Sequence, residues 1–143
     1  MRPGDLPLKL MNLLHGTAIT LSGGRLGWTA GKMPALRLTT TGRKSGQPRS
    51  VMLTSPLQRG EIVVIVASKG GSDEHPDWYL NLVAHPEVTV TFQGGAERKM
   101  RARTATAAER AELWPHVTGA YGGYAGYQQK TDRTIPVVLL EPA

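Results

Sequence analysis

The centre of the chain contains an unbroken apolar run, Ile62-Val63-Val64-Ile65-Val66. A strand that is apolar at every position is normally buried on both faces, because one set of its alternating side chains would otherwise point into water. The chain has 143 residues, which suits one ordinary domain with a real core. The fold must therefore place other elements on both faces of this strand, which is predicted from Glu61 to Ala67.

Further strands are expected on both sides of this run. The segments Ala35 to Thr41, Arg49 to Ser55 and Ile135 to Leu140 have strand character. Residues 88–104 predict an antiparallel hairpin, because valine and phenylalanine alternate with threonine, a Gly94-Gly95 pair supplies the turn, and charged residues alternate along the returning strand. One face of this hairpin should be charged.

Two helices follow from local signals. Pro76 suits the first turn of a helix that continues to Val83, and Pro86 marks its end. The sequence Thr106-Ala107-Ala108-Glu109 is a capping box that opens a helix, which Pro115 should kink or restart. With a further helix near the N-terminus, we expect about six strands and three helices. Meandering strands with single inserted helices favour a small antiparallel barrel over a doubly wound parallel sheet.

The first 33 residues differ in character from the rest. The stretch from Leu6 to Leu21 is rich in leucine and predicts an amphipathic helix, and the glycines from Gly23 to Gly31 predict a flexible link. The apolar stretch is too short to cross a bilayer. The helix either packs on the domain or rests on a membrane surface. We therefore divide the chain into residues 1–33, a helix and link, and residues 34–143, the barrel domain.

Composition limits the chemistry. The chain has no cysteine, which excludes thiolate metal sites and fits a reducing cytoplasm, and its four histidines are scattered, so no metal site is expected. The formal net charge is +6 with a pI near 10.0, which indicates either simple solubility or attraction to an anionic partner. No Rossmann glycine fingerprint, Walker loop or nucleophile elbow is present.

Two loops place cations and flexible backbone at the ends of predicted strands. One runs from Thr39 to Arg49 and contains Gly42-Arg43-Lys44-Ser45-Gly46, and the other is Ser68-Lys69-Gly70-Gly71. Glycine allows the main chain to approach an anion, while arginine and lysine supply donors for phosphate or carboxylate. Such loops predict a phosphorylated ligand.

Aromatic residues cluster in two places. Trp78 and Tyr79 follow the second loop, while Tyr121, Tyr124 and Tyr127 recur every three residues, which puts them on roughly one helical face. The tyrosines are either packing residues or a mobile cover whose phenol groups face a pocket. A basic rim with aromatics also describes a nucleic-acid binder, but the only aromatic on a predicted strand is Phe92, so nucleic acid is not the expected partner.

Four motifs in order resemble the deazaflavin-dependent nitroreductase family of actinobacteria, from about Pro34 to the C-terminus. They are Leu38 to Arg49, Val66 to Gly71, His75 to Leu82, and Tyr127-Gln128 with Thr131 to Pro136. The resemblance implies a mainly β fold with inserted helices, a split β-barrel of the FMN-binding type. It also implies reductase activity with coenzyme F420, an 8-hydroxy-5-deazaflavin that carries a phosphodiester and an oligoglutamate tail.

The same resemblance assigns residues to the cofactor. Arg43, Lys44, Ser45 and Arg49 would hold the phosphate and glutamate end, with Lys69, Ser68 and Gly70 close to it. Ala67 would lie under the deazaflavin ring. The inserted helix would line the cofactor with four of its residues, Asp77, Trp78, Tyr79 and Asn81.

By the same match, Tyr124 would contact the substrate or stabilise developing negative charge, with Tyr121, Tyr127 and Ser68 as further candidates. In members that reduce nitroimidazoles a tyrosine stands in the second strand after the basic loop, where this chain has Leu53-Thr54-Ser55-Pro56-Leu57. Quinones and activated enones are therefore expected as hydride acceptors ahead of nitro compounds. A flavin mononucleotide enzyme of the same barrel class and a non-enzymatic cofactor or nucleic-acid module remain as alternatives.

Overall fold

The computed structural model describes residues 29–30 and 33–143, and within them eight strands form one antiparallel sheet. Six of these strands match the predicted ones in place, and the two additional strands are short. The strands are β1 (Thr29–Ala30), β2 (Met33–Thr41), β3 (Pro48–Thr54), β4 (Leu57–Arg59), β5 (Ile62–Val66), β6 (Glu87–Phe92), β7 (Arg98–Thr104) and β8 (Val137–Pro142). The predicted helix from Leu6 to Leu21 lies outside the described residues.

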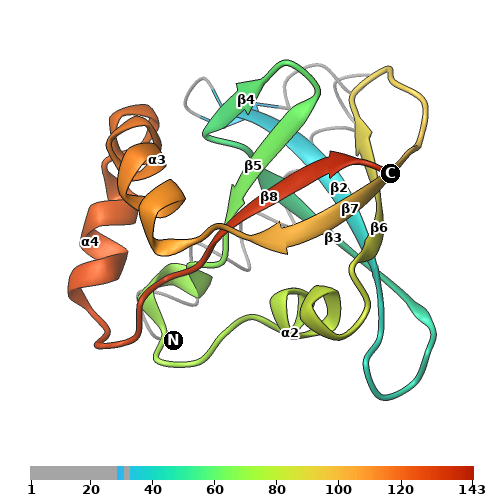
Figure 1. Cartoon of the computed structure of the whole chain (residues 1–143), viewed down its shortest axis with the longest axis horizontal. Helices are drawn as coiled ribbons and strands as arrows, with labels where there is room; N and C mark the ends of the chain where they lie inside the picture. The colour runs from blue at the N-terminus through green and yellow to red at the C-terminus, as the bar shows by residue number, and fades with distance from the viewer. Residues whose placement is uncertain (1–28, 31–32) are drawn as a thin grey trace.

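The sheet curls into a split β-barrel, which confirms the predicted fold class (Figure 1). Its strands follow the order β1-β2-β6-β7-β8-β5-β4, with β3 paired to β2. In the described part of the chain, only the β2–β6 and β5–β8 pairs join strands that are not consecutive. The β6–β7 hairpin is confirmed, and it pairs Val88 with Met100 and Val90 with Arg98. Its inward residues Met100 and Ala102 are buried, while Lys99, Arg101 and Arg103 are exposed.

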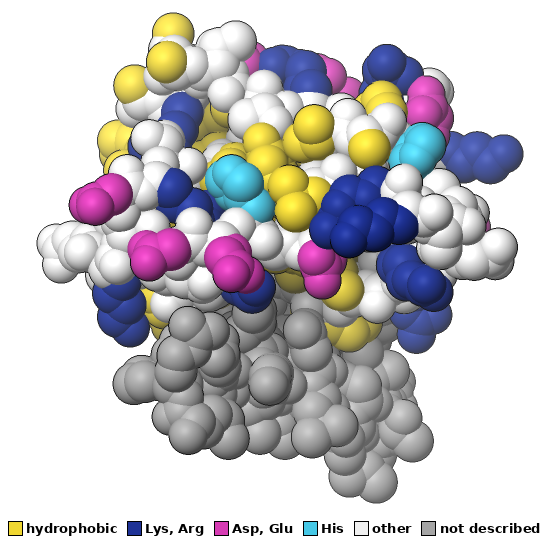
Figure 2. Space-filling view, turned by 90° about the horizontal axis from the view of Figure 1, so that it is seen from below, with side chains coloured by type: hydrophobic (Ala, Val, Ile, Leu, Met, Phe, Trp, Pro, Cys, Tyr) yellow, Lys and Arg dark blue, Asp and Glu magenta, His cyan; other side chains and the backbone are white. Residues whose placement is uncertain are grey.

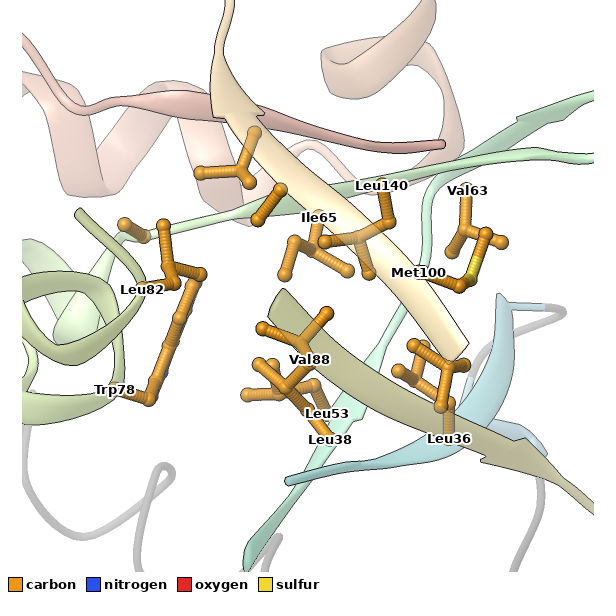
Figure 3. Packing of buried hydrophobic residues seen from close by; sticks show 14 residues of the cluster. Leu36, Leu38, Leu53, Val63, Ile65, Trp78, Leu82, Val88, Met100 and Leu140 are labelled. Carbon is orange, nitrogen blue, oxygen red and sulfur yellow. The ribbon is translucent and has the colours of Figure 1, made fainter. Parts of the chain in front are cut away.

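The apolar strand β5 separates two hydrophobic clusters, as its sequence predicted. Val63 and Ile65 point into the barrel, where they join a cluster that includes Leu36, Leu38, Val90 and Leu140 (Figure 3). Val64 and Val66 point to the other face and belong to a second cluster beneath two helices. All four valine and isoleucine side chains of residues 63–66 are buried, so both faces of β5 are covered.

Three α-helices cover the barrel within the described residues. Helix α2 (Asp77–Ala84) crosses one end of it and inserts Trp78 and Leu82 into the inner cluster (Figures 1 and 3). Helices α3 (Ala107–Ala120) and α4 (Gly123–Gln129) lie together on the outer face and cover the second cluster with Leu113, Val117 and Tyr124. None of the described helices is long and apolar enough to cross a membrane.

The capping box is confirmed, while two local expectations about α3 and its neighbour need correction. Thr106 accepts a hydrogen bond from the backbone of Glu109, whose side chain bonds back to the Thr106 amide. Helix α3 continues through Pro115 instead of restarting there. The three tyrosines do not share one helix, because Tyr121 is the C-cap of α3, and Tyr124 and Tyr127 belong to α4.

Candidate functional site

The loop between β2 and β3, residues 42–47, forms a closed turn that we call the basic loop. The amide of Gly42 donates to the carbonyl of Gln47 and the amide of Gly46 donates to the carbonyl of Gly42, both at 2.8 Å. Ser45 Oγ accepts from the Gln47 amide at 3.1 Å. A Cβ atom on Gly42 would lie 2.6 Å from Ser45 Oγ and 3.3 Å from the Gln47 carbonyl oxygen, so a larger residue there would displace the Ser45 side chain. The turn holds the neighbouring cations at the end of the β2–β3 ribbon.

Asn81 and Asp77 join the basic loop to α2. Asn81 Oδ1 accepts from the Arg43 amide at 3.1 Å and from Arg43 Nη1 at 2.8 Å. Its amide nitrogen donates to Thr40 Oγ1 at 3.3 Å, and the Asn81 side chain is buried. Arg43 Nη2 lies 3.3 Å from Asp77 Oδ1. Helix α2 therefore fixes the direction of the Arg43 side chain, although the two segments lie 34 and 38 residues apart.

These residues line a polar hollow of about 320 Å³ that is open to solvent. Three cations and one carboxylate face it, so its field attracts anions. We call it the polar hollow, and its lining residues are Gly42, Arg43, Lys44, Ser45, Arg49, Asp77 and Asn81.

The second predicted loop follows β5 and forms a tight turn, residues 68–72, that we call the lysine turn. Lys69, Gly70 and Gly71 all have left-handed backbone, with φ of 45°, 63° and 87°. Lysine adopts this region at a cost of about 1–2 kcal/mol. A Cβ atom on Gly71 would lie 2.8 Å from the carbonyl oxygen of Tyr127, so the turn packs directly against α4.

Between the lysine turn, β3 and α4 lies an apolar hollow, which we call the tyrosine hollow. Its cavity volume is about 60 Å³, and its mouth opens to solvent. Its lining residues are Met33, Met52, Leu53, Thr54, Val66, Ser68, Lys69, Gly70, Pro76, Trp78, Tyr121, Tyr124 and Tyr127. Figure 2 shows the face that carries α2 from below, where hydrophobic side chains gather beside a group of Lys and Arg side chains.

The three tyrosines form an aromatic cluster on one wall of this hollow. Their ring centroids lie 5.3 to 6.2 Å apart, and the hydroxyls of Tyr121 and Tyr127 are 3.4 Å apart. Burial raises the pKa of Tyr124, and burial together with the Tyr121 hydrogen bond raises the pKa of Tyr127. Both phenols are therefore protonated at neutral pH and can donate a hydrogen bond to an oxygen in the hollow.

Most of the predicted site residues meet in these two hollows. The cations Arg43, Lys44 and Arg49 share the polar hollow, but Lys69 lines the tyrosine hollow, where its Nζ lies 3.5 Å from Glu74 Oε2. Two predicted cofactor residues line neither hollow. Ala67 is fully buried, and Tyr79 is half-buried with its hydroxyl 2.8 Å from Thr104 Oγ1.

The sequence did not indicate several residues that line the tyrosine hollow. Met33 and Met52 come from β2 and β3, and nothing in their local pattern marks them. Arg133 was part of a motif but received no role, yet its guanidinium makes two hydrogen bonds to the lysine turn, at Ser68 and Ser72, and two to the flanking residues Ala67 and His75. In the part of the chain that the structure describes, no three His, Asp or Glu side chains are placed to hold a metal ion.

Comparison with known proteins gives consistent matches. Residues 14–142 match the family described as F420H(2)-dependent quinone reductase, so the match begins well before Pro34. An F420H(2)-dependent quinone reductase of Mycobacterium tuberculosis (strain ATCC 25618 / H37Rv) is 38% identical over 131 residues, which cover 89% of this chain and 87% of the relative.

Two solved structures are also similar. One is an F420-H2 dependent reductase, FDR-A, which is 43% identical with a TM-score of 0.67 and covers 76% of this chain and 94% of its own. The other, described as a domain-swapped dimer, is 38% identical with a TM-score of 0.70 and covers 90% of this chain and 96% of its own.

Proposed function

The chain belongs to the F420H(2)-dependent quinone reductase family, and from this premise we propose that it transfers a hydride from reduced coenzyme F420 to a quinone. One observation carries the proposal. The adjacent residues Asp77 and Trp78 line different hollows, one cationic and one apolar. A single ligand with an anionic tail and a flat ring system would use both.

The residues of the polar hollow fit the tail of this cofactor. Phosphate and carboxylate groups prefer arginine, lysine, hydroxyl and backbone amide donors, and the hollow offers Arg43, Lys44, Arg49 and Ser45. Gly42 has no side chain, which leaves its backbone open to close approach by the ligand. We assign the tail to these residues and the ring to the tyrosine hollow, next to Trp78.

The tyrosine hollow supports an apolar acceptor. Bound in its reduced form, F420 supplies the hydride. The protein contributes an apolar wall from Met33, Met52 and Val66, which excludes water, and phenols that remain protonated. Tyr124 is buried, and we assign it the hydrogen bond to the acceptor oxygen. Tyr121, whose exposed fraction is 39%, contacts both other rings and connects them to solvent.

Cofactor binding is the test of this proposal. Purified protein is titrated calorimetrically with F420 and, separately, with flavin mononucleotide, and reduced F420 is then mixed with menadione. We expect F420 to bind with a Kd on the order of micromolar or tighter and the menadione to be reduced. Binding of flavin mononucleotide without affinity for F420 would instead establish the alternative flavin enzyme. If F420 binds but no acceptor oxidises its reduced form, the protein is a cofactor-binding module without reductase activity.

A variant tests the role of Tyr124. Tyr124→Phe removes only the hydroxyl, so we expect turnover to fall by about 100-fold while the Kd for F420 stays within about twofold. Equal losses in turnover and in F420 affinity would make Tyr124 a packing residue. A parallel series with an activated enone and a nitroimidazole ranks the acceptor classes, and we expect the quinone to be the best of the three.

We also propose that the enzyme acts in the cytoplasm and meets lipid-borne quinones through the segment from Leu6 to Leu21, which lies outside the described residues. The support is the leucine-rich pattern of that segment. Cosedimentation with anionic phospholipid vesicles tests it. The full chain should sediment with the vesicles, and the double variant Leu13→Asp, Leu14→Asp should not. Equal sedimentation of the two proteins would show that the leucines of this segment do not bind the membrane.

A further inference from the structure

The lysine turn is a strained segment that needs support from outside itself. Three successive residues, Lys69 to Gly71, have positive φ. Within the turn, only two short backbone bonds are formed, from the Gly71 amide to the Ser68 carbonyl at 2.9 Å and from the Ser72 amide to the Lys69 carbonyl at 3.1 Å. A strained backbone persists only where its surroundings determine it.

Arg133 provides contacts at both ends of this turn. Its Nε donates to the carbonyl oxygen of Ser72 at 2.8 Å, and its Nη2 donates to the carbonyl oxygens of Ala67 and Ser68 at 3.2 and 2.9 Å. Its Nη1 lies 3.1 Å from His75 Nδ1. Because the guanidinium can only donate, it binds that ring nitrogen as an acceptor. One planar group therefore bridges the entrance and exit of the turn.

Arg133 itself is anchored to the helices of the outer face. The Gln128 side chain donates to the Arg133 carbonyl at 2.7 Å and accepts from the Ile135 amide at 2.9 Å. Arg110 on α3 donates to the same Gln128 side chain and to the Ile135 carbonyl, each at 2.9 Å. Gln128 belongs to α4, the helix that carries Tyr124 and Tyr127. The network thus links two opposite walls of the tyrosine hollow.

We propose that Arg133 is a positioning residue, which holds the lysine turn against α4 so that Ser68, Lys69 and Gly70 face Tyr124 and Tyr127 at a fixed separation. This inference rests on the proposed function, since it gives the tyrosine hollow its shape for the cofactor ring and the acceptor. Arg133 lines neither hollow, so it acts on the site through the residues that it contacts, of which Ser68 lines the tyrosine hollow.

A rival explanation is that Arg133 acts only through its positive charge, by attracting the anionic cofactor. The two explanations predict different behaviour for a lysine in its place. An ammonium group keeps the charge but cannot reproduce a planar fork that reaches three carbonyls at once. Arg133→Lys should therefore behave like Arg133→Gln if Arg133 positions the turn, and like the wild type if only its charge matters.

Amide hydrogen exchange on the protein alone, without cofactor, provides the first measurement. We expect the Gly71 and Ser72 amides to exchange at least 10-fold faster in both Arg133 variants, while the Val64 and Ile65 amides of β5 stay protected. Arg103→Lys is the matched control. Its guanidinium makes three hydrogen bonds, to Glu109 and Glu141, and does not touch the turn. It should leave exchange at Gly71 and Ser72 unchanged.

A measurement on the wild type covers the case in which both variants fail to fold. The Arg133 Nε–H should exchange with solvent at least 10-fold more slowly than that of Arg101, which is exposed and pairs through Nη1 alone. Equal exchange of the two groups would overturn the inference. So would unchanged protection of Gly71 and Ser72 in Arg133→Lys.

Cofactor affinity gives the second readout. In Arg133→Lys we expect the Kd for F420 to rise by about 10-fold and kcat to fall with it, whereas Arg103→Lys should match the wild type. Normal affinity and turnover in Arg133→Lys would refute the positioning role and leave the reductase activity standing. If wild-type protein does not bind F420, the proposed function fails, while the exchange measurements still decide whether Arg133 holds the turn.

Discussion

Replacement of Gly71 by alanine tests how tightly the lysine turn packs against α4. The new Cβ would lie 2.8 Å from the Tyr127 carbonyl oxygen and 3.1 Å from the Cβ and Cδ atoms of Lys130. The φ of +87° costs a side chain about 1–2 kcal/mol, and overpacking adds about 1–3 kcal/mol. Alanine also lowers the conformational entropy of the unfolded chain, which stabilises the folded protein by about 0.4–1 kcal/mol. We expect a net loss of about 2–4 kcal/mol in the free energy of unfolding.

Gly94→Ala is the control that separates the cost of the steric clash from the cost of the positive φ. Gly94 has a similar φ of +70°, and a Cβ there would meet no atom within 4 Å. This variant should lose about 1 kcal/mol. At about 2–4 °C per kcal/mol, the melting temperature should fall by about 4–16 °C for Gly71→Ala and by about 2–4 °C for Gly94→Ala. Equal shifts of the two variants would show that α4 does not press on the turn and would refute the packing argument.

Two further predictions concern charged groups. Arg43→Ala should weaken F420 binding by about 1.5–3 kcal/mol through loss of a charge-assisted bond, measured by calorimetry, whereas Arg59→Ala, which breaks only the distant pair with Glu112, should not. Hydrogen bonds from Arg103 and then from the Thr106 backbone amide lower the pKa of Glu109 from 4.5 to about 2. The stabilisation from this depressed pKa is complete above pH 4.5 and is lost as the pH falls toward 2. The difference in melting temperature between wild type and Glu109→Gln should therefore shrink over that range. A constant difference would show that the ionised Glu109 side chain does not stabilise the fold.

Local signals in the sequence were sufficient for most of the elements. The unbroken apolar run predicted that β5 is covered on both faces, and the alternation along residues 88–104 predicted the hairpin and its charged face. The capping box at Thr106 predicted the start of α3. Each of these depends on neighbours within a few residues, where periodicity and capping chemistry are decisive.

The contacts that shape the site join residues far apart in the sequence. Asn81 binds Arg43 across 38 residues, and Arg133 binds Ser72 and Ser68 of the lysine turn across 61 and 65 residues. No periodic pattern reports such pairings, so Arg133 received no role from the sequence. Local signals were also misleading at helix ends: α3 continues through Pro115, where the sequence predicted a kink or a restart. The spacing of Tyr121, Tyr124 and Tyr127 is helical, but the glycines between them allow one helix to end and another to begin.

Strand β5 separates two sets of residues that line the tyrosine hollow, and each set can be mutated without the other. The barrel interior supplies Trp78 and Leu53 to the tyrosine hollow, while the cluster beneath α3 and α4 supplies Met33, Val66 and Tyr124. A mutant library confined to the second cluster would change the apolar wall of the tyrosine hollow and leave the barrel interior unchanged. If that wall contacts the acceptor, as we propose, acceptor preference would change while binding of the cofactor tail stays the same.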